Sequence, residues 1–243
     1  MNKFFFGTTL AVALSGSLHA APVSLTQDFE TCANVAACGA TVTFVADGTA
    51  TSVNLRPSGD TINTNVGAGF DSFFTSRFLA IGDISGDIGN EPNGQSSGGL
   101  SRASFGLGSL SAGSYSFVVG FDYVVDTNST AGNPDQSPDD FLVRFETVPG
   151  SGALASVLDL SATNIIRNLS PRQAGFSTTV AFTLGSASNV YLSFSLQEFN
   201  DGSSSAAGID NLRISGNRVP EPGSLALAGL AMVGLATLRR RRC

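Results

Sequence analysis

Tyr115-Ser-Phe-Val-Val-Gly-Phe-Asp-Tyr123 alternates large apolar residues with smaller or polar ones. Successive side chains of a β-strand point to opposite faces of the sheet. One face of this stretch would therefore carry Tyr115, Phe117, Val119, Phe121 and Tyr123. Such alternation is typical of a strand with one face on a core and the other in solvent, so the stretch predicts an antiparallel sheet.

Further runs rich in Phe, Val and Thr flank this stretch on both sides. They cover residues 41–45, 73–81, 100–107, 141–147, 176–184, 190–196 and 208–214. Clusters of Gly, Ser, Asn and Asp separate them, and no convincing helix lies between them. We therefore expect an all-β fold, an antiparallel β-sandwich of the jelly-roll type. The long loops at 82–99 and 126–139 are natural places for variable function.

The charge of the chain excludes one class of partner. Of 243 residues, 13% are charged and 42% are hydrophobic, which suits one β-rich domain with targeting segments. Residues 21–218 hold eight Arg against eighteen Asp and Glu, a net charge of 8 − 18 = −10. Such a domain repels phosphates, so we do not expect it to bind nucleic acid. Divalent cations and neutral glycans remain possible ligands.

The N-terminus has the layout of a secretory signal peptide. Lys3 precedes an apolar run that ends at Leu14, and small residues lead to Ala20. We expect residues 1–20 to be removed by signal peptidase after Ala20, so that the mature protein begins with Ala21. The alternative is a buried N-terminal strand or helix.

The C-terminal residues 219–243 form a separate unit. Pro220-Glu221-Pro222 interrupts any preceding element, and residues 223–238 carry no charge. A helix of this length spans about 24 Å, a short transmembrane helix against a hydrocarbon core of about 30 Å. The cluster Arg239-Arg240-Arg241-Arg242 would stay in the cytoplasm and hold the 21–218 domain outside the inner membrane.

This tail resembles the PEP-CTERM sorting signal. The resemblance rests on the order of Pro220-Glu221-Pro222, the apolar helix and the arginines of 239–242. It implies recognition by an exosortase, a membrane-embedded cysteine protease of Gram-negative bacteria that make exopolysaccharide. Substrates of that enzyme often reach the cell surface or the biofilm matrix. The alternative is a plain C-terminal membrane anchor, and Cys243 receives no role.

A second resemblance concerns the two ends of the domain. It opens with Gln27-Asp-Phe-Glu30 and closes with Ala207-Gly-Ile-Asp-Asn-Leu-Arg-Ile214. This pairing resembles carbohydrate-binding-like jelly rolls, in which the first and last strands are neighbours and often hold a structural calcium. The resemblance implies a calcium site that includes Glu30 and Asp210. Ordinary capping and turn roles are the alternative, and the acidic loop 83–91 is a weaker calcium candidate.

A disulfide is expected between Cys32 and Cys38. They are the only cysteines of residues 21–218, and export places them in an oxidising compartment. The residues between them are small, so a tight closed loop is sterically easy. Two free buried thiols are the alternative.

The residue inventory argues against most catalysis. Residues 21–218 contain no His and no Lys, so a Ser-His-Asp triad, a Cys-His dyad or a His-ligated zinc site cannot be built. Carboxylate pairs remain available in principle. Trp is absent, and the three Tyr lie in strand runs where core packing is expected. No residue points to a particular sugar.

We therefore expect a non-enzymatic exported surface or biofilm-matrix protein. Two alternatives stay open. One is a carbohydrate- or ice-binding module delivered by the same route, for which the Thr residues at 41, 43, 178 and 179 are too sparse to argue an ice-binding row. The other is a polysaccharide hydrolase or lyase. Exopolysaccharide is a possible partner in each case.

Overall fold

A computed structural model describes residues 22–45, 52–59, 73–82, 100–127, 140–160, 172–197, 205–220, 229, 231 and 232. The signal peptide expected at 1–20, most of the sorting tail and the acidic loop 83–91 lie outside these residues. Within the described ranges, no helix has both the length and the apolar character needed to cross a membrane.

The described residues form eleven strands in two antiparallel sheets. The six-stranded sheet contains β3 (Ser52–Arg56), β4 (Phe78–Gly82), β11 (Ser205–Val219), β6 (Gly113–Thr127) and β9 (Arg172–Leu184) in that order, with β1 (Val23–Gln27) also paired to β11. The five-stranded sheet contains β2 (Ala40–Val45), β5 (Leu100–Leu110), β10 (Ser188–Gln197), β7 (Asp140–Val148) and β8 (Ser151–Leu160) in that order.

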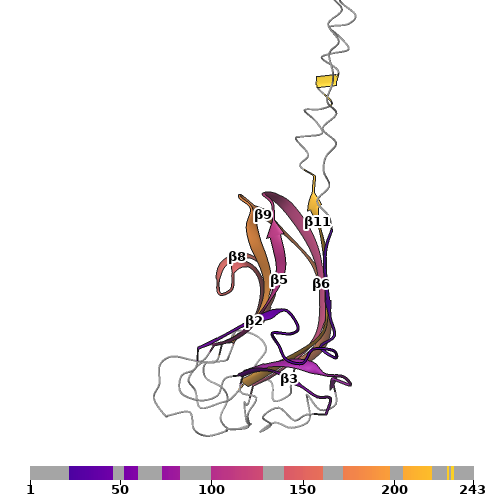
Figure 1. The fold of residues 1–243 in the computed structure, drawn as a ribbon, viewed down its shortest axis with the longest axis vertical. Coiled ribbons are helices and arrows are strands. Elements are labelled where there is room, and N and C mark those ends of the chain that lie inside the picture. Colours follow the sequence, from indigo (N-terminus) through magenta and orange to yellow (C-terminus); the bar gives the residue numbers. More distant parts are fainter. Residues whose placement is uncertain are drawn as a thin grey trace, which may run out of the picture.

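The strand order confirms the predicted fold class. Strands β4, β6, β9 and β11 lie in one sheet, and β5, β7, β8 and β10 lie in the other. The chain therefore passes back and forth between the sheets, which is the order of an eight-stranded jelly roll. The long strands β5, β6, β9 and β11 run along the body of the domain, and the short strands β2 and β3 lie towards one end of it (Figure 1).

Aromatic side chains fill the space between the sheets. The five large residues that alternate from Tyr115 to Tyr123 are all at most 4% exposed, so the predicted inward face is confirmed. The ring of Phe117 on β6 lies 5.1 Å from that of Phe145 on β7 and 5.4 Å from that of Phe182 on β9. Burial of such side chains contributes about 1.5 to 3 kcal/mol each, which makes this layer the main source of stability.

Three strands were missed by the sequence pattern, and two other expectations were wrong in detail. Strands β1 and β3 alternate apolar and polar residues, but each has only five residues and two aliphatic side chains. Strand β8 is rich in Gly, Ala and Ser and has an irregular burial pattern. The run predicted from residue 73 pairs only from Phe78 onward. Tyr191 is not a core residue, because it lies on the outer face of the five-stranded sheet with its ring over Gly106. The ring covers backbone that a glycine leaves open.

The first and last strands are neighbours, as the resemblance to carbohydrate-binding-like jelly rolls implied. Val23 of β1 pairs with Gly216 of β11, and β11 ends at Val219, which still pairs with Ser114. Pro220 follows directly, and it lacks the N–H needed to extend the ladder. The chain therefore enters and leaves the domain at the same end.

Candidate functional site

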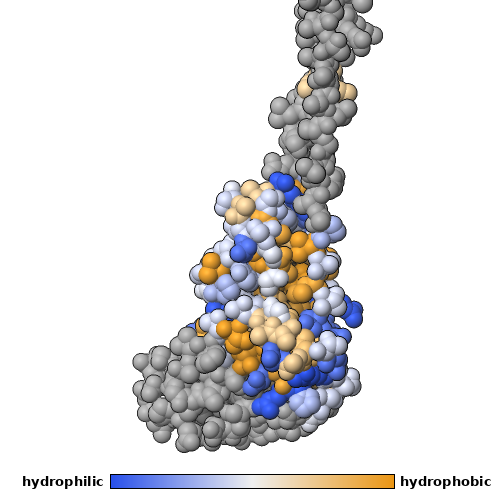
Figure 2. All heavy atoms as spheres, in the orientation of Figure 1, coloured by the Kyte–Doolittle hydropathy of each residue, from blue (hydrophilic) through white to orange (hydrophobic). Residues whose placement is uncertain are grey.

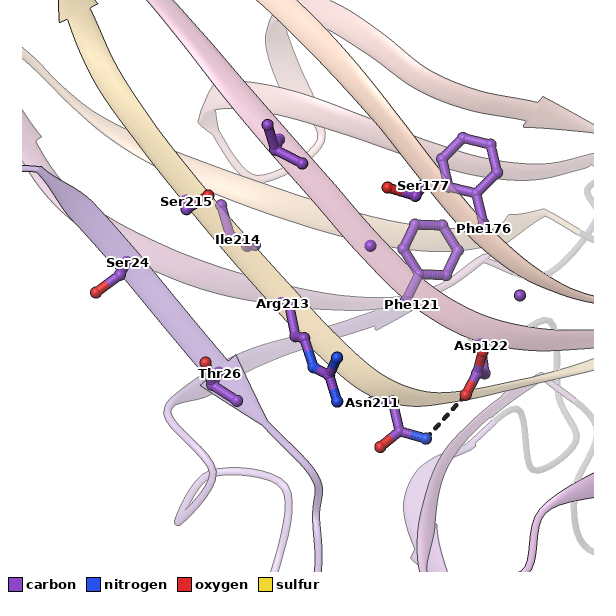
Figure 3. Close-up of a pocket in the computed structure, with 13 residues that line it drawn as sticks. Ser24, Thr26, Phe121, Asp122, Phe176, Ser177, Asn211, Arg213, Ile214 and Ser215 are labelled. Atoms are coloured by element: carbon purple, nitrogen blue, oxygen red, sulfur yellow. Dashed lines mark hydrogen bonds between the residues drawn. The ribbon is translucent and has the colours of Figure 1, made fainter.

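A groove of about 590 Å³ lies on the outer face of the six-stranded sheet. It crosses four adjacent strands, β1, β11, β6 and β9 (Figure 3). Its lining consists mostly of hydroxyl-bearing, small and amide-bearing residues: Ser24, Thr26, Val118, Gly120, Phe121, Asp122, Gly175, Phe176, Ser177, Asn211, Arg213, Ile214 and Ser215. At about 4.8 Å between strands, the four strands span about 14 Å.

The hollow follows from the register of the strands. One row across the sheet reads Thr26, Arg213, Gly120, Ser177. Gly120 places no side chain between Arg213 and Ser177, so the floor of the groove is backbone at this point. A Cβ at Gly120 would meet its nearest neighbour, the carbonyl oxygen of Phe176, at 3.5 Å. This is ordinary contact, so the position has room for a side chain that it does not carry.

A β-bulge shapes one end of the groove. The ladder between β11 and β6 is interrupted between Asp210 and Arg213, and Asn211 adopts a left-handed φ of 53°. Asparagine tolerates this conformation better than most residues. The bulge directs the Asn211 side chain across the strand, where its Nδ2 donates a 2.8 Å hydrogen bond to Oδ2 of Asp122.

Behind this end lies a buried carboxylate. Asp210 stands opposite Asp122 in the ladder and is 1% exposed. Its Oδ2 accepts a 2.5 Å hydrogen bond from the Ser76 hydroxyl. Its Oδ1 accepts a 2.7 Å hydrogen bond from the backbone N–H of Asn211. Burial raises the pKa of Asp210, the negative charges of Asp122 and Glu30 raise it further, and the two hydrogen bonds oppose the change.

The structure places both sequence-predicted calcium residues in this corner. Oε1 of Glu30 accepts a 2.5 Å hydrogen bond from the Arg77 amide, and Asp210 is bonded to the preceding residue, Ser76. The negative charge of Asp122 also acts on Asp210 and raises its pKa. Sequence reasoning missed Asp122 because only the register between β6 and β11 brings it near Asp210. The carboxylates supply the hard oxygen donors that calcium prefers. Among the described residues, however, no group of three or more His, Cys, Asp or Glu is arranged to hold a metal ion.

The disulfide predicted between Cys32 and Cys38 is present, with Cα atoms 5.2 Å apart. Closing so short a loop contributes roughly 2 to 2.5 kcal/mol by the chain-entropy estimate. The loop is joined to β1 by a 3.1 Å hydrogen bond from Nε2 of Gln27 to the Cys38 carbonyl. Phe29 makes the turn between them with a φ of 60°, and its ring is fully buried. The disulfide therefore anchors the segment that carries Glu30.

The described surface is only weakly polar. Figure 2 shows a face on which strongly hydrophilic residues are scattered among pale and hydrophobic ones. This agrees with the low charged fraction of the chain, 13%. The groove shares this character, because Asp122 and Arg213 are the only charged residues in the described part of its lining. Sequence reasoning missed the groove and placed variable function in loops that lie mostly outside the described residues.

Fold and tail together define an exported β-sandwich protein. Residues 218–242 match the PEP-CTERM protein-sorting motif, so the resemblance of the tail is confirmed. This motif indicates export and sorting to the cell envelope, with an exosortase as the processing partner. No curated protein matches the chain significantly.

Several solved structures resemble the fold at low identity. The K1 cleaved adhesin domain of Lys-gingipain from Porphyromonas gingivalis W83 is 14% identical, with a TM-score of 0.39, over 79% of this chain and 96% of that one. TmCBM61 in complex with β-1,4-galactotriose is 11% identical, with a TM-score of 0.35, over 72% and 86%. A cyclase from Fischerella sp. TAU is 8% identical, with a TM-score of 0.43, over 82% and 100%.

Proposed function

We propose that the mature protein is a non-enzymatic surface or biofilm-matrix protein that binds polysaccharide in the groove of the six-stranded sheet. The observation that carries this proposal is the lining of the groove. It offers hydroxyl groups from Ser24, Thr26, Ser177 and Ser215 over a glycine floor. Hydroxyl and amide groups at fixed spacing are suited to the many hydroxyls of a sugar chain. An extended groove across four strands is suited to a polymer rather than to a small metabolite.

The charge pattern supports binding rather than hydrolysis. Glycoside hydrolysis in most enzyme families uses two carboxyl groups on opposite sides of the bond that is cleaved. Among the described residues, Asp122 is the one carboxylate in the lining of the groove, and Asp210 behind it is buried and hydrogen-bonded to protein donors. A protein that its tail directs to the cell envelope and that binds exopolysaccharide would connect the cell to its matrix.

Filling the floor of the groove tests this proposal. Gly120→Val places a side chain in the hollow, where the Cβ has ordinary contacts and the β-branched residue suits a strand. We expect the protein to fold with an unchanged or slightly higher melting temperature and to lose at least tenfold in polysaccharide affinity. Affinity electrophoresis against galactan, dextran and polygalacturonate measures the binding.

Ala181→Val is the matched control, because Ala181 is exposed on β9 outside the groove lining. This variant should bind like the wild type. Equal binding by the two variants would show that the groove is not the binding surface. Release of reducing ends from any of the polymers would contradict the non-enzymatic part of the proposal.

We further propose that Glu30 and Asp210 bind a structural calcium ion and that backbone carbonyls complete its shell of oxygen ligands. A cation there would offset the repulsion among Asp210, Asp122 and Glu30 that accompanies the raised pKa of Asp210. At a calcium concentration of one hundred times Kd, linkage gives about 2.7 kcal/mol of stabilisation. The melting temperature should therefore rise with calcium and fall with chelator.

In Asp210→Asn this response should disappear, whereas Asp159→Asn, at an exposed residue paired with Arg144, should keep it. Calcium should also change how the stability of the folded protein depends on pH. Without it, the raised pKa means that ionised Asp210 costs stability, so stability should fall as pH rises through that pKa. A wild-type melting temperature that does not respond to calcium would end the proposal.

A further inference from the structure

Arg213 projects from β11 at the centre of the groove. Its neighbours in the row across the sheet are Thr26 on β1 and Gly120 on β6. In Figure 3 its guanidinium lies between the side chains of Thr26 and Asn211. Because Gly120 carries no side chain, its position in this row offers Arg213 no packed side-chain neighbour on β6.

No described residue forms a hydrogen bond or an ion pair with the Arg213 side chain. Three other described arginines are engaged: Arg77 with the Cys32 carbonyl, Arg102 with Ser195 and Arg144 with Asp159. Each of these side chains is held in place by a partner in the domain. The Arg213 guanidinium instead presents its five N–H donors, in a fixed planar fork, to the groove.

Asp122, the other charged residue of the lining, has a different surrounding. Its Oδ2 accepts a hydrogen bond from the side-chain amide of Asn211, which holds the carboxylate at the bulged end of the groove. The groove thus has a cation on β11 and a restrained anion on β6, with Asn211 between them (Figure 3). This arrangement is polar along its length and would orient a ligand that carries both an anionic group and hydroxyls.

We infer that the groove selects acidic polysaccharides, with the carboxylate of a uronic acid unit bound by Arg213 and sugar hydroxyls donating to Asp122. The inference rests on the proposed function and names its substrate class. A planar carboxylate matches the guanidinium fork with two parallel hydrogen bonds. The domain of residues 21–218 has a net charge of 8 − 18 = −10, so general electrostatic attraction cannot hold an anionic polymer. Binding must come from a local cation.

The test compares two polymers that differ only at the carboxyl group, which is ionised in one and a neutral methyl ester in the other. The full chain, kept soluble in a nonionic detergent, is titrated with polygalacturonate and with its fully methyl-esterified form. We expect the wild type to bind the acidic form about tenfold more tightly, the size of effect expected for a charge-assisted hydrogen-bonded pair. Arg213→Gln should lose this preference and keep its affinity for the esterified form. Arg213 is exposed, so the variant should fold normally.

Arg144→Gln, which removes an arginine from the five-stranded sheet, is the matched control and should behave like the wild type. Equal affinity for both polymers, unaffected by Arg213→Gln, would overturn the inference and leave the proposed function standing. Absence of binding to either polymer, to dextran and to galactan would contradict the proposed function itself. Tighter binding of dextran sulfate than of polygalacturonate would overturn the choice of a carboxylate.

Discussion

Replacing Pro220-Glu221-Pro222 with three alanines is expected to abolish processing of the tail completely. The motif match begins at residue 218 and includes this tripeptide, which directly follows the last ladder residue, Val219. Proline at both positions prevents a continuous strand or helix from running into the apolar segment, so a protease can find an extended site there. Alanine favours helix and removes this break.

The unprocessed protein should accumulate in the inner membrane fraction. Pulse labelling followed by membrane fractionation and immunoblotting would show a single larger species in place of the mature form. Deletion of residues 220–243 is the control, because it leaves β11 intact up to Val219 and should release a folded domain into the periplasm or medium. Unchanged processing and location in the alanine variant would favour a plain membrane anchor over a sorting signal.

Gly216→Val is expected to destabilise the domain by about 3 kcal/mol, the upper part of the range for overpacking a core. Gly216 on β11 pairs with Phe117 on β6, and a Cβ at Gly216 would lie well inside van der Waals contact with the Phe117 ring. That ring is fully buried and packs against the rings of Phe145 and Phe182, so it has no free space to move into. The strain must instead separate the strands or force Phe117 from its rotamer.

Urea unfolding followed by circular dichroism measures this loss of stability. Gly120→Val is the control, because it introduces the same side chain in the same sheet on the open outer face, and it should leave the midpoint unchanged or raise it. Combining Gly216→Val with Phe117→Leu should recover part of the lost stability by returning volume to the site. If Gly216→Val unfolds at the wild-type urea concentration, the packing of Phe117 against β11 is not as described.

Much of the fold was predictable because its signals are local. The alternation from Tyr115 to Tyr123 identified the buried face of β6, and the same reasoning located most of the long strands. The tail was predictable for the same reason, since Pro220-Glu221-Pro222 and the arginines of 239–242 are contiguous in sequence. Strands β1 and β3 were missed because an alternation over only five residues is a short signal, and β8 was missed because its small residues give a weak period.

The candidate site was predictable only in fragments. Glu30 and Asp210 were named from the opening and closing phrases of the domain, and the structure places them in one corner through Ser76 and Arg77. Asp122 was visible only as an outward residue of its strand. Arg213 belonged to the closing phrase of the domain but received no role.

By itself, the sequence determined the fold class, the inward face of β6 and the sorting signal, because periodicity and contiguous motifs act over a few neighbouring residues. Tertiary structure decided that Gly120 opens a groove whereas Gly216 sits against a phenylalanine ring. It also decided that Arg213 stands opposite a glycine and that burial raises the pKa of Asp210. These properties depend on which strands pair and in what register. Register joins residues far apart in the chain, and a shift of one residue would reverse every face.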